Sequence, residues 1–97
     1  MNEHNYWVYI LSNFRRSVFY VGMTSNLSRR VEQHAAKAVA GFSEKYNCDQ
    51  LLYAERLGDV RDALEREKQV KKYSREKKMS LIRSMNPEFL DITNLLD

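Results

Sequence analysis

Residues 7–34 read WVYILSNFRRSVFYVGMTSNLSRRVEQH, and the rest of the chain is organised around this stretch. Its first part alternates as a β-strand does, with one face made by Trp7, Tyr9 and Leu11 and the other by Val8 and Ile10. A second run alternates in the same way, with Val18, Tyr20 and Gly22 on one face and Phe19, Val21 and Met23 on the other. The two runs predict a β-hairpin centred on Phe14-Arg15, in which Tyr9 stands opposite Tyr20.

A helix is predicted directly after this hairpin. Residues 24–26, Thr-Ser-Asn, offer side-chain oxygens to the first N–H groups of a helix. The row expected to face the core is Leu27, Val31 and Ala35. Arg30 and His34 form a second row about 100° around the helix, at the border between core and solvent. We expect the helix to end before Gly41, at residue 38 or 40, and to bring both side chains beside the two tyrosines.

The rest of the chain predicts one more strand and two more helices. Residues 51–56 alternate as a short strand, with Leu51, Tyr53 and Glu55 on one face and Leu52, Ala54 and Arg56 on the other, and an edge of the hairpin is its expected partner. Asp59 is a candidate N-cap for the second helix. Ser74 can cap a third, which should run from Arg75 to Met85 before Asn86-Pro87. The pattern predicts a three-stranded antiparallel sheet flanked by helices, an α/β fold of the α+β type, in one domain over residues 1–97 with its core at about 6–91.

The second helix carries a carboxylate in its predicted inward row. The apolar members of this row are Val60, Ala63, Leu64 and Val70, and Glu67 completes the helical series. A buried carboxylate is costly unless it finds a cation, a metal ion or a raised pKa. On the pattern alone, a salt bridge to Arg30 or Lys71 is favoured over a catalytic or metal-binding role.

Composition excludes several classes of protein. No apolar run approaches the roughly 20 residues of a membrane span, and the N-terminus MNEHNY lacks the features of a signal peptide. We therefore expect a cytoplasmic protein without a membrane partner. Cys48 is the one cysteine, so it cannot form an internal disulfide, and we expect a structural role for it.

Positive charge is concentrated in the last third of the chain. The net charge is only +3, but residues 66–83 hold eight cations and two anions. Dense basic segments commonly bind phosphate backbones, and a solvated helix face is the alternative interpretation. The candidate nucleic-acid-binding cations are Lys68, Lys71, Lys72, Arg75, Lys77 and Lys78.

Taken in register, these residues resemble the GIY-YIG nucleases. Trp7-Val8-Tyr9 stands where that family has Gly-Ile-Tyr, and Tyr20-Val21-Gly22 stands where it has Tyr-Ile-Gly. The family's arginine falls ten residues after the second tyrosine, on Arg30, and its recurrent histidine falls on His34. Similarity extends from about residue 6 to residue 91, as in the short stand-alone members. The chain departs from the family pattern at Trp7, which replaces the first glycine.

The resemblance implies a catalytic set and a cofactor. Glu67 matches the family's metal-binding glutamate, and Asn86 matches a polar residue near the end of the domain that we assign to nucleic-acid binding. A single Mg²⁺ or Mn²⁺ ion on Glu67 is implied, and Mg²⁺ commonly takes only one or two carboxylates. The candidate catalytic residues are therefore Tyr9, Tyr20, Arg30, His34 and Glu67.

The resemblance implies a role for each of these residues in the hydrolysis of a phosphodiester. Tyr9 would be the base, provided that a nearby cation lowers its pKa, and Arg30 would stabilise the charge that develops on the phosphate. Tyr20 would orient the water or the phosphate, and His34 would hydrogen-bond Tyr9 or relay its proton. Two functions remain open: an endonuclease or nicking enzyme with low sequence preference, and a weakly catalytic or non-catalytic nucleic-acid-binding module. DNA is favoured over RNA, and a monomer is assumed.

Overall fold

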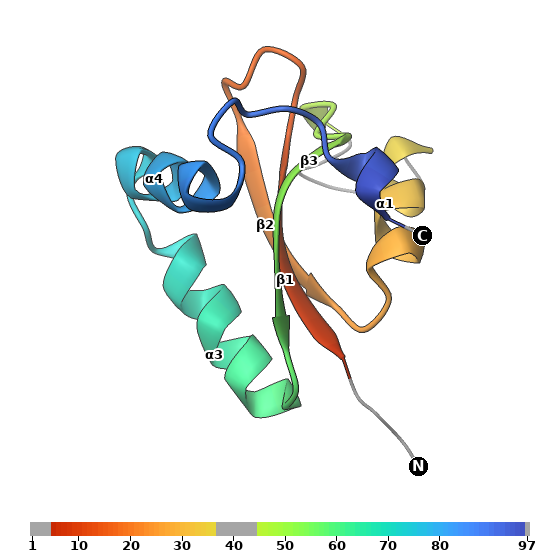
Figure 1. Ribbon diagram of the computed structural model, residues 1–97, viewed down its shortest axis with the longest axis vertical. Helices are drawn as coiled ribbons and strands as arrows, with labels where there is room; N and C mark the ends of the chain where they lie inside the picture. The colour runs from red at the N-terminus through yellow and green to blue at the C-terminus, as the bar shows by residue number, and fades with distance from the viewer. Residues whose placement is uncertain (1–4, 37–44, 97) are drawn as a thin grey trace.

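The computed structural model describes residues 5–36 and 45–96 of the chain. Three antiparallel strands form one sheet in the order β2-β1-β3, with β1 in the centre. Helices α3 and α4 cover one face, and α1 with the C-terminal 3₁₀ turn covers the other (Figure 1). This arrangement confirms the predicted fold. The elements are β1 (Tyr6–Ser12), β2 (Phe19–Thr24), α1 (Leu27–Ala35), β3 (Gln50–Leu57), α3 (Val60–Lys71), α4 (Arg75–Met85) and η1 (Thr93–Leu95).

The central strand β1 divides the core into two halves. Val8 and Ile10 pack under α3 and α4, whereas Tyr9 and Leu11 pack toward α1, and all four are buried. The strand reads as a nearly continuous apolar run because both of its faces are covered. Cys48 lies buried in the α1 half, where burial raises the pKa of its thiol to about 11, as suits an unreactive structural residue.

The register of the hairpin differs from the prediction. Tyr9 pairs with Gly22, and Leu11 pairs with Tyr20. The loop shifts the register because the Asn13 side chain accepts hydrogen bonds from the backbone of residues 17 and 18, and Arg16 adopts a left-handed φ of 61°. These local bonds centre the turn between residues 15 and 16. The two tyrosines are therefore diagonal neighbours on one face of the sheet, not a directly opposed pair.

A β-bulge in β3 overturns the predicted alternation of that strand. Ile10 pairs with Tyr53 and Leu11 pairs with Leu51, so Leu52 is an extra residue on its side of the ladder. Leu51 faces α1, whereas Leu52 and Tyr53 both belong to the core under α3 and α4. Sequence alternation does not show where an extra residue is inserted, which is why the faces of Leu51 and Tyr53 were predicted wrongly.

The helix starts, and the end of α4 at Met85, were predicted correctly, whereas the end of α1 and part of the inward row of α3 were not. Asn26, Asp59 and Ser74 cap α1, α3 and α4 through their side-chain oxygens. Helix α1 ends at Ala35, earlier than expected, and Gly41 lies outside the described residues. Val60 and Leu64 are more than 40% exposed, so the inward row of α3 differs from the predicted one: Ala63 and Val70 are buried, and Arg66 and Glu67 are half-buried. No helix within residues 5–36 and 45–96 has the length and apolar character that crossing a membrane requires.

Candidate active site

Tyr9, Tyr20 and His34 form an aromatic cluster between the sheet and α1. The Tyr9 hydroxyl lies 3.2 Å from Nε2 of His34. The ring centroid of Tyr20 is 6.3 Å from that of Tyr9 and 5.1 Å from that of His34. Tyr9 and His34 are buried, and Tyr20 is half-buried. The predicted convergence of the two strand tyrosines and the helical histidine is therefore present.

Gly22 makes room for this cluster. It lies opposite Tyr9 in the ladder, and a Cβ atom added there would stand 2.5 Å from Cζ of Tyr9 and 3.1 Å from Cε1 of Tyr20. Any side chain at this position would have to displace the Tyr9 ring. The glycine thus allows the tyrosine to lie across the neighbouring strand.

Burial sets the protonation states of Tyr9 and His34. Desolvation raises the pKa of Tyr9 well above its ordinary value, and the charges of Tyr20 and Glu67 add to the increase. Arg30 acts in the opposite direction, as predicted, but its effect is smaller than that of burial. Desolvation, with a further contribution from Arg30, lowers the pKa of His34. At neutral pH the pair is a protonated phenol beside a neutral imidazole, so the expectation of a Tyr9 with lowered pKa does not hold in this protein without bound ligands.

Arg30 and Glu67 approach the cluster from opposite layers. Arg30 is half-buried on α1, and Glu67 lies on α3 with its side chain about 20% exposed. The charges of both residues act on the Tyr9 hydroxyl. The Glu67 carboxylate also forms an ion pair with Lys71, with 3.2 Å between Oε2 and Nζ. Lys71 is one of the two ion-pair partners that the helical pattern favoured. Because the Lys71 side chain is about half exposed, this pair is worth less than about 1 kcal/mol and leaves the carboxylate available.

The donor set around Glu67 suits only a loosely held metal ion. The described residues contain no group of three or more His, Cys, Asp or Glu side chains that could enclose a metal. A single accessible carboxylate does fit Mg²⁺, which keeps several water ligands and binds through one or two carboxylates. Glu67 is therefore the residue that would hold such an ion.

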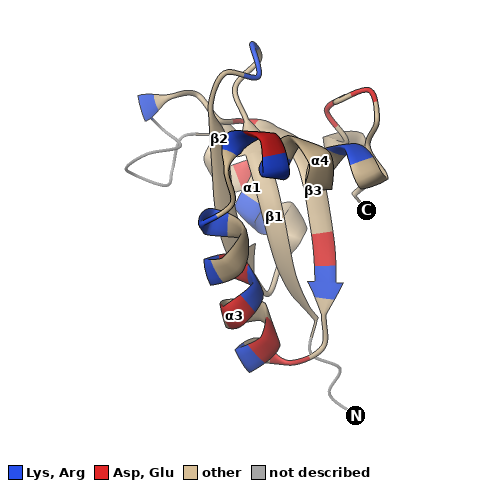
Figure 2. Cartoon of the chain, turned by 90° about the vertical axis from the view of Figure 1, so that its left-hand side faces the viewer, with Lys and Arg blue, Asp and Glu red and all other residues tan. Residues whose placement is uncertain are grey.

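The basic candidates differ in what they already contact. Arg75 donates hydrogen bonds to the carbonyl oxygens of Ser17 and Arg16 at 2.9 and 2.6 Å. Lys77 lies 4.3 Å from the centre of the Tyr73 ring. Figure 2 shows these cationic segments of α3 and α4 on one side of the molecule. Lys68 on α3 and Lys72 at the C-cap of that helix are exposed, and Lys71 and Lys78 line a groove along β2.

Asn86 has a structural position that the sequence did not reveal. Its side chain is buried and donates to the carbonyl oxygens of Leu52 and Leu90 at 3.0 and 2.7 Å. Its own oxygen accepts from the backbone N–H of Leu90. These bonds hold the C-terminal segment against the bulge of β3. Since its polar atoms are occupied inside the protein, we leave Asn86 out of the proposed nucleic-acid surface.

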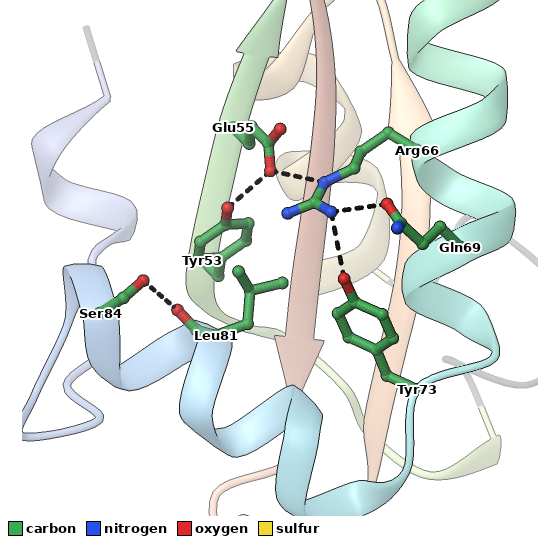
Figure 3. Close-up of polar contacts among 7 residues, drawn as sticks. All are labelled: Tyr53, Glu55, Arg66, Gln69, Tyr73, Leu81 and Ser84. Atoms are coloured by element: carbon green, nitrogen blue, oxygen red, sulfur yellow. Dashed lines mark hydrogen bonds and ion pairs between the residues drawn. The ribbon is translucent and has the colours of Figure 1, made fainter.

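A second polar cluster lies on the α3 and α4 side of the sheet and was not predicted (Figure 3). Glu55 accepts hydrogen bonds from Tyr53 at 2.7 Å and from Arg66 at 3.0 Å. Arg66 also donates to Gln69 and to the Tyr73 hydroxyl. The cluster joins β3 to α3 and to the turn before α4. It depends on the bulge, which turns Tyr53 and Glu55 toward these helices.

Comparisons with known proteins agree with this geometry. A family model described as the GIY-YIG catalytic domain matches residues 5–80. A UPF0213 protein of Haloquadratum walsbyi is 37% identical over 81 residues, which cover 84% of this chain and 89% of that protein. One from Natronomonas pharaonis is 33% identical over 78 residues, covering 80% and 91% respectively.

A solved structure is also similar over nearly the full length of both chains. The solution NMR structure of a UPF0213 protein from Bacillus halodurans has a TM-score of 0.58 and 28% sequence identity, and the match covers 95% of this chain and 97% of that one. The names of these relatives state no activity, whereas the matched domain is that of a nuclease superfamily whose substrates are nucleic acids. The chain therefore belongs to the GIY-YIG family and, within it, resembles the small stand-alone UPF0213 proteins.

Proposed function

We propose that the protein is a metal-dependent endonuclease or nicking enzyme that hydrolyses phosphodiester bonds, with DNA as the favoured substrate. The observation that carries the proposal is the contact of the Tyr9 hydroxyl with His34, together with the charges of Arg30 and Glu67, both of which act on that hydroxyl. A buried tyrosine beside a neutral histidine is a proton relay, and a guanidinium and a carboxylate beside it match the needs of a phosphate and a divalent ion.

Tyr9 and His34 would move the proton of the attacking water together. As the water oxygen bonds to phosphorus, its proton passes to the Tyr9 oxygen, and the phenolic proton passes to Nε2 of His34. This route avoids a free phenolate, which the raised pKa of Tyr9 disfavours. Arg30 would donate hydrogen bonds to the phosphate oxygens, and Tyr20 would orient the water or the phosphate. One Mg²⁺ or Mn²⁺ ion held by Glu67 would stabilise the charge on the leaving oxygen.

Several finer features belong to the same proposal. Low sequence preference is proposed because lysine and arginine contacts to phosphates carry no sequence information. The binding side chains would be Lys68, Lys71, Lys72, Arg75, Lys77 and Lys78. We further propose that the enzyme acts as a monomer in the cytoplasm and serves DNA repair or recombination.

Cleavage assays on matched variants test the proposal. Labelled branched, single-stranded and duplex DNA and RNA would be incubated with and without Mg²⁺ or Mn²⁺. Arg30→Ala should reduce the rate by about 10²–10³-fold, by analogy with the loss of one oxyanion donor, while Arg29→Ala on the same helix should retain it. Glu67→Gln should abolish the metal-dependent rate. Glu65→Gln, two positions earlier on α3, should not.

Two results would contradict this assignment. The first is wild-type protein that cleaves none of these substrates with either ion. The second is retention of full rate by both Arg30→Ala and Glu67→Gln. Thermal stability of every variant serves as the control, because a destabilised Glu67→Gln protein with normal turnover would show that the carboxylate is only the ion-pair partner of Lys71.

A nucleic-acid-binding module without efficient catalysis is the second candidate. Two observations favour it: the pKa of Tyr9 is raised, and Glu67 is paired with Lys71. Binding that persists in all variants, without cleavage by the wild type, would identify this function.

A further inference from the structure

A groove runs along the outer edge of β2, next to the candidate active site. It is lined by Phe19, Tyr20 and Val21 from β2 and by Lys71 and Lys78 from the helices, with a volume of about 320 Å³. Successive residues of a strand point to opposite faces, so a groove lined by three of them in sequence follows the edge of the strand. In the described sheet, β2 is an outer strand that pairs with β1.

This groove shares residues with the catalytic cluster. Tyr20 lines it and also lies 5.1 Å, ring to ring, from His34. Lys71 lines it and also pairs with Glu67. Helix α3 packs against β2, and cationic segments of α3 and α4 lie on this side of the sheet (Figure 2). A strand whose scissile phosphate met Arg30 and Glu67 would therefore place a neighbouring nucleotide in the groove.

The lining residues suit an unpaired nucleotide. Two lysines provide positive charge for its phosphate, and the aromatic residues Phe19 and Tyr20 provide surfaces on which a base can stack. Phe19 already stacks with a cation, since the Arg75 guanidinium lies 4.9 Å from its ring centre. The edge of β2 adds backbone N–H and C=O groups. Inside a duplex both faces of a base are covered by its neighbours, so only an unpaired base can contact these rings.

We infer that the β2 groove binds an unpaired nucleotide adjacent to the scissile phosphate, so that single strands, flaps and branch points are bound in preference to continuous duplex. This inference rests on the proposed function for the position of the phosphate. It assigns to Phe19 and Lys78 a substrate-selecting role, in addition to the general attraction of the basic surface.

Binding measured without metal tests the inference separately from catalysis. Fluorescence anisotropy in the presence of a chelator would compare a DNA single strand, an RNA single strand and a blunt duplex of the same sequence and length. We expect tighter binding of the single strands. Phe19→Leu keeps an apolar side chain but removes the ring, and it should weaken single-strand binding by about fivefold to a hundredfold while duplex binding changes little.

Matched variants separate the groove from general effects. Phe14 is an 80% exposed aromatic residue outside the groove, so Phe14→Leu should leave the ratio of single-strand to duplex affinity unchanged. Lys78→Gln should lower this ratio, whereas Arg61→Gln, which removes an equal charge from an exposed position of α3 outside the groove, should not. The fluorescence of a 2-aminopurine base in the single strand reports stacking on a protein ring. This stacking signal should be lost with Phe19→Leu but kept with Phe14→Leu.

The outcomes distinguish failure of this inference from failure of the nuclease proposal. Equal or tighter binding of the duplex by wild-type protein overturns the groove assignment, as does an equal effect of Phe14→Leu and Phe19→Leu. A preference for single strands that depends on Phe19 supports it even if no substrate is cleaved. Preference for only the DNA or only the RNA single strand also supports it and identifies the sugar that the groove accepts.

Discussion

At the scale of single residues, the absence of a side chain at Gly22 leaves the space that the Tyr9 ring occupies. Its hydrogen atom faces the Tyr9 ring, and the closest carbon contact of an added Cβ would be 2.5 Å. Gly22→Ala should therefore displace Tyr9 and destabilise the protein by about 1–3 kcal/mol, as overpacking of a core does. Thermal unfolding would measure the change.

Gly58 provides the matched control for this prediction. A Cβ added at Gly58 meets no atom within 4 Å, so Gly58→Ala should leave the midpoint of unfolding nearly unchanged. Equal destabilisation by the two substitutions would contradict the account given for Gly22.

His34 should make stability dependent on pH. Its pKa is lowered in the folded protein by burial and by Arg30, so the unfolded chain binds the proton more readily. The contribution of His34 to stability is therefore complete above the ordinary histidine pKa of about 6.5, and it is lost as the pH falls through that value and the lower folded pKa. Unfolding midpoints between neutral and mildly acidic pH should fall less steeply in His34→Gln than in the wild type. An identical pH profile would show that the folded protein does not disfavour the charged imidazole.

At the scale of elements, Arg75 connects α4 to the hairpin loop through hydrogen bonds. Its guanidinium donates to two loop carbonyls, a geometry that a lysine cannot reproduce. Arg75→Lys should loosen the loop while keeping the charge. Hydrogen exchange at residues 13–18 should become faster, and the salt dependence of nucleic-acid binding should stay the same. A loop as protected as in the wild type would mean that these bonds do not restrain it.

Asn86 performs a related function for the C-terminal segment. Removal of its amide in Asn86→Ala would leave the carbonyl of Leu52 without this buried donor, at a cost of about 1–3 kcal/mol. The free energy of unfolding should fall accordingly, while nucleic-acid affinity of the folded protein should not change. Weaker binding at unchanged stability would restore the role in nucleic-acid binding that the sequence suggested.

The elements also show what sequence patterns can and cannot predict. Alternation located β1, β2 and β3, and capping residues located the starts of α1, α3 and α4, because both signals depend on neighbours in the chain. The 3₁₀ turn η1 was not predicted. The pairing of Tyr9 with Gly22 depends instead on hydrogen bonds within the loop, and the bulge at Leu52 lies where the distant residue Asn86 donates to the Leu52 carbonyl. The raised pKa of Tyr9 results mainly from burial among residues that are distant in the chain, which no local pattern records.

At the scale of the whole molecule, positive charge gathers on the side of α3 and α4. If these side chains neutralise phosphates, the logarithm of affinity should fall with the logarithm of salt by about 0.9 per duplex phosphate. Replacement of Lys71, Lys72, Lys77 and Lys78 together by Gln should flatten this slope, because each is at least partly exposed. Titrations at several salt concentrations provide the measurement, and an unchanged slope would identify a merely solvated surface.

The bulge at Leu52 has a consequence for how the length of this chain can change in evolution. Loss of one residue within a strand normally turns the rest of that strand over, because side chains alternate. Loss of Leu52 would instead join Leu51 directly to Tyr53, and the partners of both in β1 would remain the same. Such a deletion would remove a buried leucine and the carbonyl that accepts a hydrogen bond from Asn86. The pairing register of β3 with β1, and the face on which each remaining side chain lies, would be preserved. A deletion at Ala54 would have the opposite effect, since it would invert Glu55 and separate it from Arg66.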